Sequence, residues 1–266
     1  FANHSFTSVY EDAKGFVWVG TYGYGVYRFA PDASKYECFN QNSGLSNNNI
    51  ISISGSGNKI WLSTFGGGVA YCDISTPVPD FKNISTKDGL GSNYIYSSFT
   101  DSEGRTWFAK DGGGLAYLEK EHIRSFGQSD SVSNVIYGIV QDKDGNLWFT
   151  TPNQGIMKYN GKNFSYYRKE DNLLANSYQS IIADDFGNLI FAGNEGITVY
   201  NRNHGNFQNY TEEDGVSYLE PNLNAVFKDK DGSVWICTNQ GLVKYNPKVL
   251  ADRIVHPKLV FTACKE

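Results

Sequence analysis

Six short segments recur along the sequence, each directly after an apolar run, and they carry the side chains best suited to binding a ligand. They share small residues that suit a bend but differ in the groups that they present. Aromatic rings offer flat faces for a sugar, and charged and amide groups form directional hydrogen bonds. The predicted ligand-binding residues are Tyr22, Tyr24, Phe65, Lys110, Asp111, Gln154, Glu195, Asn239 and Gln240. Variable surface loops that bind no ligand would show the same divergence.

The residue types needed for catalysis do not gather in one place. General acid–base chemistry requires partners within hydrogen-bond reach of one another. Of the four histidines, only His4 is expected on the face that carries the six segments. His122 and His204 are expected on the opposite face, and His256 lies beyond the last repeat. We therefore predict no catalytic residues.

A metal or redox centre is not expected either. Asp142 and Asp144 resemble a fragment of a calcium loop, but the twelve-residue ligand pattern with its terminal glutamate is missing. The four cysteines show no Cys-x-x-Cys spacing, so neither a metal nor a cofactor is predicted. A disulfide between Cys38 and Cys72, in adjacent repeats, is an open alternative that only geometry decides.

The polar segments are parts of a repeat, which is clearest over Asp142–Thr151. Its aspartate can accept hydrogen bonds from amides two residues on, and Gly145 tolerates the positive φ of a tight turn. An apolar run from Leu147 then predicts a buried strand. Five copies of this phrase and one looser copy are anchored at Trp18, Trp61, Trp107, Trp148, Ile190 and Trp235. Their spacings of 43, 46, 41, 42 and 45 residues are typical of propeller blades.

Each repeat divides into four predicted strands, which we name A to D. In the fourth repeat these are 134–141, 147–151, 155–159 and 163–168. The polar segments form the B–C loops, and they share a face with the D–A connections between blades. We predict an all-β propeller of four-stranded antiparallel blades over residues 1–250, with six repeats, the last one incomplete. Since no D strand precedes the first repeat, we expect the closing strand, and with it a further blade, upstream in a parent protein.

A series of matched residues, each fourteen before its anchor, lies in the D–A connections. The members are His4, Asn47, Asn93, Asn134, Asn176 and Pro221. Asparagine side chains commonly satisfy backbone amides in turns, so we interpret most of this series as turn caps.

Composition excludes several classes of partner. The net charge is −5 and no cluster of lysine and arginine occurs, so nucleic acid and anionic membrane surfaces are not expected partners. No apolar run approaches the roughly 20 residues of a membrane helix, so no direct membrane contact is expected for this chain. Glycine and aromatic residues are abundant, in keeping with an all-β protein.

The motif D-x-x-G-x-[LV]-W-[VFI]-x-T, followed by G-[LVI]-x-x-[YF] and a D-G-L tail, resembles the two-component regulator propeller repeat over nearly all of residues 1–246. The resemblance implies a seven-bladed ring in the extracytoplasmic or periplasmic sensor region of a membrane-anchored hybrid two-component protein. It implies that 251–266 hold a linker and the first strand of an immunoglobulin-like, triple-tyrosine domain. A histidine kinase would lie further along the parent protein.

The function predicted on this basis is sensing of a small polar ligand or glycan without catalysis, in a homodimer formed through the parent ectodomain. Two alternatives are retained. The phrase around Trp148 is also similar to the streptogramin lyases, propeller enzymes whose chemistry uses histidine, glutamate and magnesium. A platform for protein interaction or dimerisation would fit the same fold, because propellers host many functions.

Overall fold

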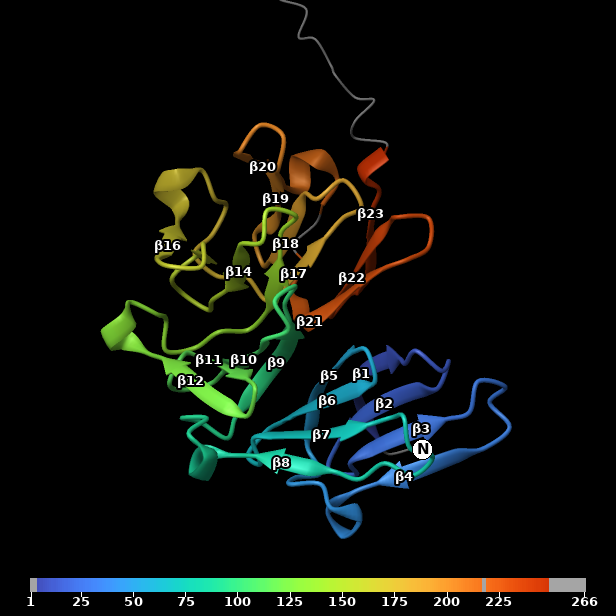
Figure 1. Ribbon diagram of the computed structural model, residues 1–266. Coiled ribbons are helices and arrows are strands. Elements are labelled where there is room, and N and C mark those ends of the chain that lie inside the picture. The colour runs from blue at the N-terminus through green and yellow to red at the C-terminus, as the bar shows by residue number, and fades with distance from the viewer. Residues whose placement is uncertain (1–3, 217–218, 249–266) are drawn as a thin grey trace, which may run out of the picture.

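The computed structural model describes residues 4–216 and 219–248 and contains 23 strands in six antiparallel sheets. Figure 1 shows the sheets following one another around a common centre, which confirms the predicted all-β propeller. Helix is nearly confined to five short 3-10 turns. No helix in the described ranges is long and apolar enough to cross a membrane. The segment 251–266, predicted to begin a further domain, lies outside the described residues.

The first three blades each contain four strands in chain order. Blade 1 comprises β1 (Ser5–Glu11), β2 (Val17–Tyr22), β3 (Val26–Phe29) and β4 (Tyr36–Phe39). Blade 2 comprises β5 (Ile50–Ser56), β6 (Lys59–Thr64), β7 (Val69–Asp73) and β8 (Lys82–Ile84). Blade 3 comprises β9 (Ile95–Thr100), β10 (Thr106–Lys110), β11 (Leu115–Glu119) and β12 (His122–Phe126).

Blades 4 and 5 repeat this order, and blade 6 has three strands in the described part of the chain. Blade 4 comprises β13 (Ile139–Gln141), β14 (Leu147–Thr150), β15 (Ile156–Tyr159) and β16 (Phe164–Tyr167). Blade 5 comprises β17 (Ser180–Ala183), β18 (Leu189–Gly193), β19 (Gly196–Asn201) and β20 (Asn206–Tyr210). Blade 6 comprises β21 (Pro221–Lys228), β22 (Val234–Thr238) and β23 (Gly241–Tyr245).

The A–B hairpins are built on an aspartate that serves two sets of donors. Asp142 Oδ1 accepts the backbone N–H groups of Asp144 and Asn146 at 3.0 and 2.8 Å. Its Oδ2 accepts the indole Nε1–H of Trp148 at 2.7 Å. The first contact confirms the predicted turn, and the second explains why tryptophan follows the aspartate by six residues. The same indole bond joins Asp12 to Trp18, Asp101 to Trp107 and Asp229 to Trp235, at 2.7–2.8 Å.

Apolar cores lie between successive blades. Five clusters of buried side chains join blade 1 to 2, 2 to 3, 3 to 4, 4 to 5 and 5 to 6. In the described chain no such cluster joins blade 6 to blade 1. The apolar side chains Phe6 on β1 and Phe227 on β21 are 54% and 63% exposed. The ring is therefore open between its first and last blades.

The open seam corrects one expectation about the anchor tryptophans. Trp18, Trp61, Trp107 and Trp148 are buried against the following blade, as predicted. Trp235 was expected to be buried as well, but it is only partly buried. It lies on β22 of the last blade, and no described blade packs against that surface.

Candidate functional site

The face that carries the B–C loops is held together by hydrogen bonds between neighbouring blades. The glycine at the end of each of four B–C loops donates its N–H to a carbonyl in the next D–A connection. The pairs are Gly25 with Asn48, Gly68 with Asn93, Gly114 with Asn134 and Gly155 with Asn176, at 2.8–3.1 Å. These bonds fix the loops at defined heights above the strands. We call this surface the loop face.

Asparagine side chains cap the turns of the loop face, as predicted. Asn93 Oδ1 accepts the N–H of Thr86, and Asn176 Oδ1 accepts that of Lys169, at 2.9 and 3.1 Å. In blade 2 this role belongs to Asn48, whose Oδ1 accepts the N–H of Gln41 at 2.9 Å. Asn47, the predicted residue, caps its own turn instead, since its Oδ1 accepts the N–H of Asn49 at 2.8 Å. The one-residue offset arises because the A–B hairpin of blade 2 is one residue shorter than the others.

The inner strand of blade 3 bulges where it reaches the loop face. Ile95 pairs with Lys110 and Ser97 pairs with Ala109, so Tyr96 between them has no partner in the ladder. Blade 4 has an irregular start as well, because Thr150 supplies its backbone oxygen to Tyr137 and its hydroxyl to Gly138. A bulge re-aims the side chain of the extra residue. Tyr96 and Tyr137 are thereby placed together at the mouth of the ring.

These tyrosines form a compact cluster with two of the predicted ligand-binding residues. The Phe65 ring lies 4.8 Å from that of Tyr94 and 6.1 Å from that of Tyr96, and Tyr96 lies 5.1 Å from Tyr137 between centroids. The Tyr96 hydroxyl donates to Asp111 Oδ2 at 3.0 Å. Backbone bridges from Phe65 to Tyr94 and from Asp111 to Val135 join blades 2, 3 and 4 beneath the side chains. We call Phe65, Tyr94, Tyr96, Asp111 and Tyr137 the loop-face cluster.

The pKa values of two phenols in the cluster, Tyr96 and Tyr137, are raised. Burial, the hydrogen bond to Asp111 and the charge of that carboxylate raise the pKa of Tyr96 well above its usual range. Burial and the charge of Asp111 also raise the pKa of Tyr137. The cluster therefore offers one acidic acceptor, phenolic donors and several ring faces. This is the combination that binds polyhydroxyl ligands.

Blade 6 contributes a residue that secures the cluster from across the ring. Asn224 Nδ2 donates to the carbonyl of Tyr137 at 3.0 Å and more weakly to that of Tyr96 at 3.4 Å. The Asn224 N–H donates to the carbonyl of Gln179 in blade 5 at 3.2 Å. Asn224 has φ of 54°, a left-handed conformation that asparagine tolerates better than most residues. An asparagine at this irregular point of β21 thus ties blade 6 to blades 3, 4 and 5.

Lys110 and the two tyrosines of the first B–C loop lie outside the cluster. The Lys110 side chain is fully buried, and its Nζ donates to the carbonyl of Leu90 at 2.7 Å. Burial lowers the pKa of this amine to about 8. Tyr22 and Tyr24 are exposed on blade 1, where the Tyr24 ring lies 4.0 Å from that of His4.

The remaining predicted residues are exposed on blades 4 to 6 and are not brought together with the cluster. Glu195 pairs with Lys169 at 3.2 Å, and Asn239 Nδ2 donates to Glu220 at 3.2 Å. Gln154 and Gln240 are exposed, and only their backbone N–H groups are bonded, to threonine hydroxyls at the start of their loops. Within the described residues, no group of three or more His, Cys, Asp and Glu side chains could hold a metal ion.

The cysteines settle the open question of a disulfide. Cys38 is exposed, Cys72 is buried, and both are free thiols. Burial raises the pKa of the Cys72 thiol to about 12, so this sulfur behaves as a small apolar group of the core.

Comparison with known protein families identifies the repeat. Residues 1–23 and 130–153 match the family model described as two component regulator propeller. The chain carries the two component regulator propeller repeat. This confirms the resemblance drawn from the sequence, and the two matched segments span A and B strands of blades 1 and 4. No curated protein matches the chain.

Solved structures share the fold at low sequence identity. The extracellular domain of the hybrid two component system BT3049 from B. thetaiotaomicron is 23% identical, with a TM-score of 0.83 over 94% of this chain and 34% of that one. The extracellular domain of BT4673 from the same organism is 22% identical, with a TM-score of 0.78 over 92% of this chain and 35% of that one. The chain thus spans about a third of the length of these two ectodomains.

A propeller enzyme also shares the fold. An inactive variant of virginiamycin B lyase from Staphylococcus aureus, solved with quinupristin, is 13% identical. Its TM-score is 0.71 over 91% of this chain and 84% of that one. Similarity at this level extends to the fold alone.

Proposed function

We propose that this chain is the propeller of an extracytoplasmic sensor in a two component signalling protein, and that it binds a polar ligand, an oligosaccharide, without transforming it. The observation that carries the proposal is the loop-face cluster, in which four aromatic rings pack against one another and the Tyr96 hydroxyl donates to the Asp111 carboxylate. The propeller repeat and the fold shared with extracellular domains of two component systems support the sensor assignment.

The cluster can recognise a sugar in two complementary ways. Asp111 accepts one hydrogen bond from Tyr96 and has remaining lone pairs for ligand hydroxyl groups. Tyr94 is about half exposed, so its ring can stack against a pyranose face. The bonds of Asn224 to the carbonyls of Tyr96 and Tyr137 hold the backbone in place before a ligand arrives. A preorganised site loses less entropy on binding.

Binding becomes a signal only where the ligand favours one arrangement of the sensor over another. We propose that these arrangements belong to a homodimer of the parent ectodomain.

The test begins with a thermal-shift screen of oligosaccharides, followed by calorimetry with each oligosaccharide that raises Tm. Asp111→Asn and Tyr94→Ala should each weaken binding by about ten- to a hundredfold, because a lost charge-assisted hydrogen bond or stacking partner costs about 1–3 kcal/mol. The matched control is Asp144→Asn. Asp144 is an exposed carboxylate on the opposite face and pairs with Arg202 at 2.6 Å.

Unchanged affinity in both cluster variants would refute the proposed site. Turnover of an oligosaccharide by the protein would refute the absence of catalysis.

A further inference from the structure

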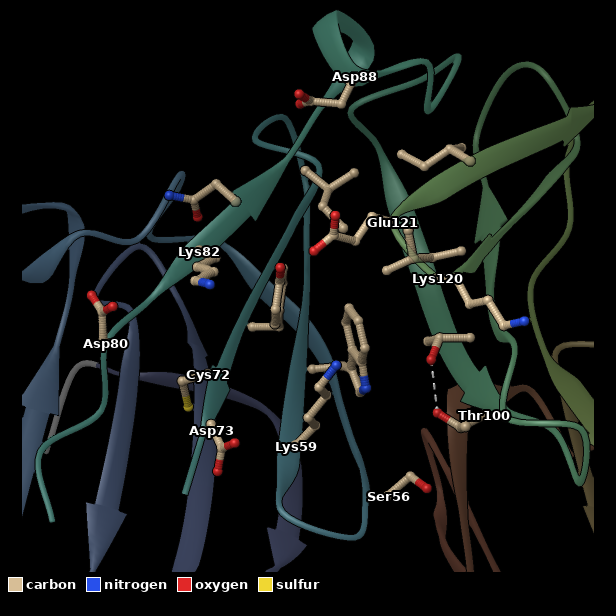
Figure 2. A pocket seen from close by; sticks show the side chains of 18 of the residues that line it. Ser56, Lys59, Cys72, Asp73, Asp80, Lys82, Asp88, Thr100, Lys120 and Glu121 are labelled. Atoms are coloured by element: carbon tan, nitrogen blue, oxygen red, sulfur yellow. Dashed lines mark hydrogen bonds between the residues drawn. The ribbon is translucent and has the colours of Figure 1, made fainter. Parts of the chain in front are cut away.

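A groove of about 900 Å³ separates blades 2 and 3 on the outer part of the propeller, away from the loop-face cluster. Figure 2 shows Lys59 and Lys82 on the blade 2 side and Thr100, Lys120 and Glu121 on the blade 3 side. Its apolar lining comes from Trp61, Tyr71, Ile84, Leu118 and Ile123. Blade 2 departs from the other blades at three points, and all three open into this groove.

The first departure is an indole without an acceptor. Trp18, Trp107, Trp148 and Trp235 each donate Nε1–H to a hairpin aspartate. Trp61 lines the groove, is only 2% exposed, and has no such partner among the described residues. Its Nε1–H is open to the groove, where a water molecule or a ligand can accept from it.

The missing acceptor follows from the short hairpin of blade 2. Ser56 pairs directly with Lys59, so the turn consists of Gly57 and Asn58 alone. The other hairpins have longer turns of the D-x-x-G type, and in blades 1, 3, 4 and 6 the aspartate accepts from the indole. In this shorter hairpin Ser56 stands at the position of the aspartate, opposite Lys59 as Asp101 lies opposite Arg105, and it makes no hydrogen bond to the indole.

The second departure is a cation that also has no ion-pair partner. In blade 3, Arg105 Nε and Trp107 Nε1 both donate to Asp101 Oδ2, each at 2.7 Å. Lys59 occupies the position of Arg105, two residues before its tryptophan, and its Nζ lies 6.0 Å from the Trp61 ring centroid. No carboxylate of the described residues lies within 4.0 Å of this ammonium. Asp73 lies opposite Lys59 on β7 but beyond ion-pair distance, so blade 2 presents both donors of the blade 3 arrangement without a carboxylate in the place of Asp101.

The third departure is that blade 2 lacks the aromatic residue found on the D strand of other blades. Ile84 pairs with Val69 as Phe126 pairs with Leu115, so it takes the place of a D-strand aromatic. The corresponding residues of blades 1, 4 and 5 are Phe39, Tyr167 and Tyr210. In blades 1, 3 and 4 these rings stack on the anchor tryptophan, with centroids 5.5–6.0 Å apart. Ile84 lines the groove and carries no ring to stack on Trp61.

We propose that this groove binds a small ligand with one carboxylate on a ring-sized polar body. The ligand carboxylate would accept from Trp61 Nε1 and Lys59 Nζ, as Asp101 does from its two donors in blade 3. The groove is also lined by the carboxylates Asp73, Asp80, Asp88 and Glu121. The negative charges of these carboxylates disfavour a polyanion, and their oxygens can accept from hydroxyl groups. The expected ligand therefore carries a single acid group and hydroxyls, and D-glucuronate is the probe. The inference does not depend on the function proposed for the loop face.

The test is a titration of the ¹⁵N-labelled protein followed through its tryptophan indole N–H signals, with Trp61 assigned from the Trp61→Phe variant. D-Glucuronate should move the Trp61 signal downfield in a saturable way, because the indole gains a charged acceptor. D-Glucose should leave it in place. Acetate should move it more weakly, which separates recognition of the acid group from recognition of the ring. The Trp148 signal is an internal control, since its indole already donates to Asp142.

Lys59→Met should weaken glucuronate binding by about ten- to a hundredfold, because it removes one charge-assisted contact and keeps the aliphatic stem. The matched control is Lys158→Met, since Lys158 on β15 places its Nζ 4.8 Å from the ring centroid of Trp148, whose indole already donates to Asp142. An unmoved Trp61 signal with both carboxylates, or equal glucuronate affinity in Lys59→Met, would overturn the proposal. Equal shifts with glucose would overturn the requirement for a carboxylate.

Discussion

The contribution of the aspartate–indole hydrogen bond to the free energy of unfolding can be measured by comparing substitutions at two tryptophans. Trp107 and Trp61 are both almost completely buried, and each has a tyrosine ring 4.7 Å away, Tyr117 and Tyr71 respectively. Only Trp107 donates its indole N–H, to Asp101 at 2.7 Å. Replacing either residue by phenylalanine removes a similar part of a buried ring. The difference between the two substitutions therefore isolates the hydrogen bond.

Trp107→Phe should lower the free energy of unfolding by about 1.5–3 kcal/mol more than Trp61→Phe does, the usual range for a hydrogen bond to a charged group. Asp101 is itself buried, so its oxygen gains little from water when the indole is lost. The assay is equilibrium denaturation in guanidinium chloride at pH 7, with equal m-values as the condition for comparing the variants. Equal losses of stability would refute the role assigned to the aspartate. Asp101→Asn in the Trp107→Phe background should then add less than it does alone.

Three further predictions follow from other parts of the chain. Because the pKa of Lys110 is about 8 when folded and its usual value is 10.5, the protein should gain stability as pH rises from 8 to 10.5. Lys110→Met should remove that gain and should be about 1–3 kcal/mol more stable than the unsubstituted protein at pH 7. If the denaturation midpoints of the two proteins change in parallel from pH 7 to 10, the prediction is wrong. Hydrogen exchange should be faster in β22 than in β14, because no described blade covers Trp235, and equal protection would show that the seam is closed. Ile84→Phe should fill the groove between blades 2 and 3, leave the protein at least as stable, and abolish the response of Trp61 to glucuronate; a retained response would place the ligand elsewhere.

The hairpins could be predicted from the sequence because their interactions are local. Asp142 and Gly145 specify the turn, and the turn fixes where Trp148 begins its strand. The 3-10 turns of the D–A connections are equally local. In the D-G-L tail, the Asp88 carboxylate accepts the N–H of Ser85 at 2.9 Å, and Gly89 takes a left-handed φ of 92°.

The loop-face cluster could be predicted only in part, because it depends on register and on contacts between blades. Phe65 and Asp111 were identified from the divergence of their loops. Tyr94, Tyr96 and Tyr137 looked like ordinary residues of inner strands, since the bulge that re-aims Tyr96 is not visible in the sequence. Asn224 could not be connected to them, because its partners are 87 and 128 residues away in the chain.

The burial of Lys110 could have been predicted from the aligned repeats. The equivalent residues Thr21, Thr64, Thr151 and Thr238 each donate a hydroxyl to the carbonyl of the glycine that ends the same loop. A threonine that bonds inward in this way marks a position directed into the loop. A lysine at this position should therefore also point inward and be buried. The Lys110 amine donates to the carbonyl of Leu90, whereas the threonine hydroxyls donate to the glycine of their own loop.

The inner strands show how a one-residue offset misleads alignment. When the repeats are aligned on their anchor residues, Ile51 stands where the other A strands have the small residues Ser8, Ser97, Gly138, Ser180 and Ala225. In the structure Ser52, opposite Ser63, occupies the place that Ser8 has opposite Gly20. The series therefore has no exception in blade 2, and the short Gly57–Asn58 turn accounts for the offset.

The most direct test of the proposed sensor function is a structure of the protein with the oligosaccharide that raises its melting temperature most. We expect density for the sugar over Tyr94 and Tyr137, with a hydroxyl group within hydrogen-bond distance of Asp111. A sugar bound instead at the open seam, against Phe6 and Phe227, or in the groove beside Trp61, would contradict the assignment of the loop-face cluster as the sensing site.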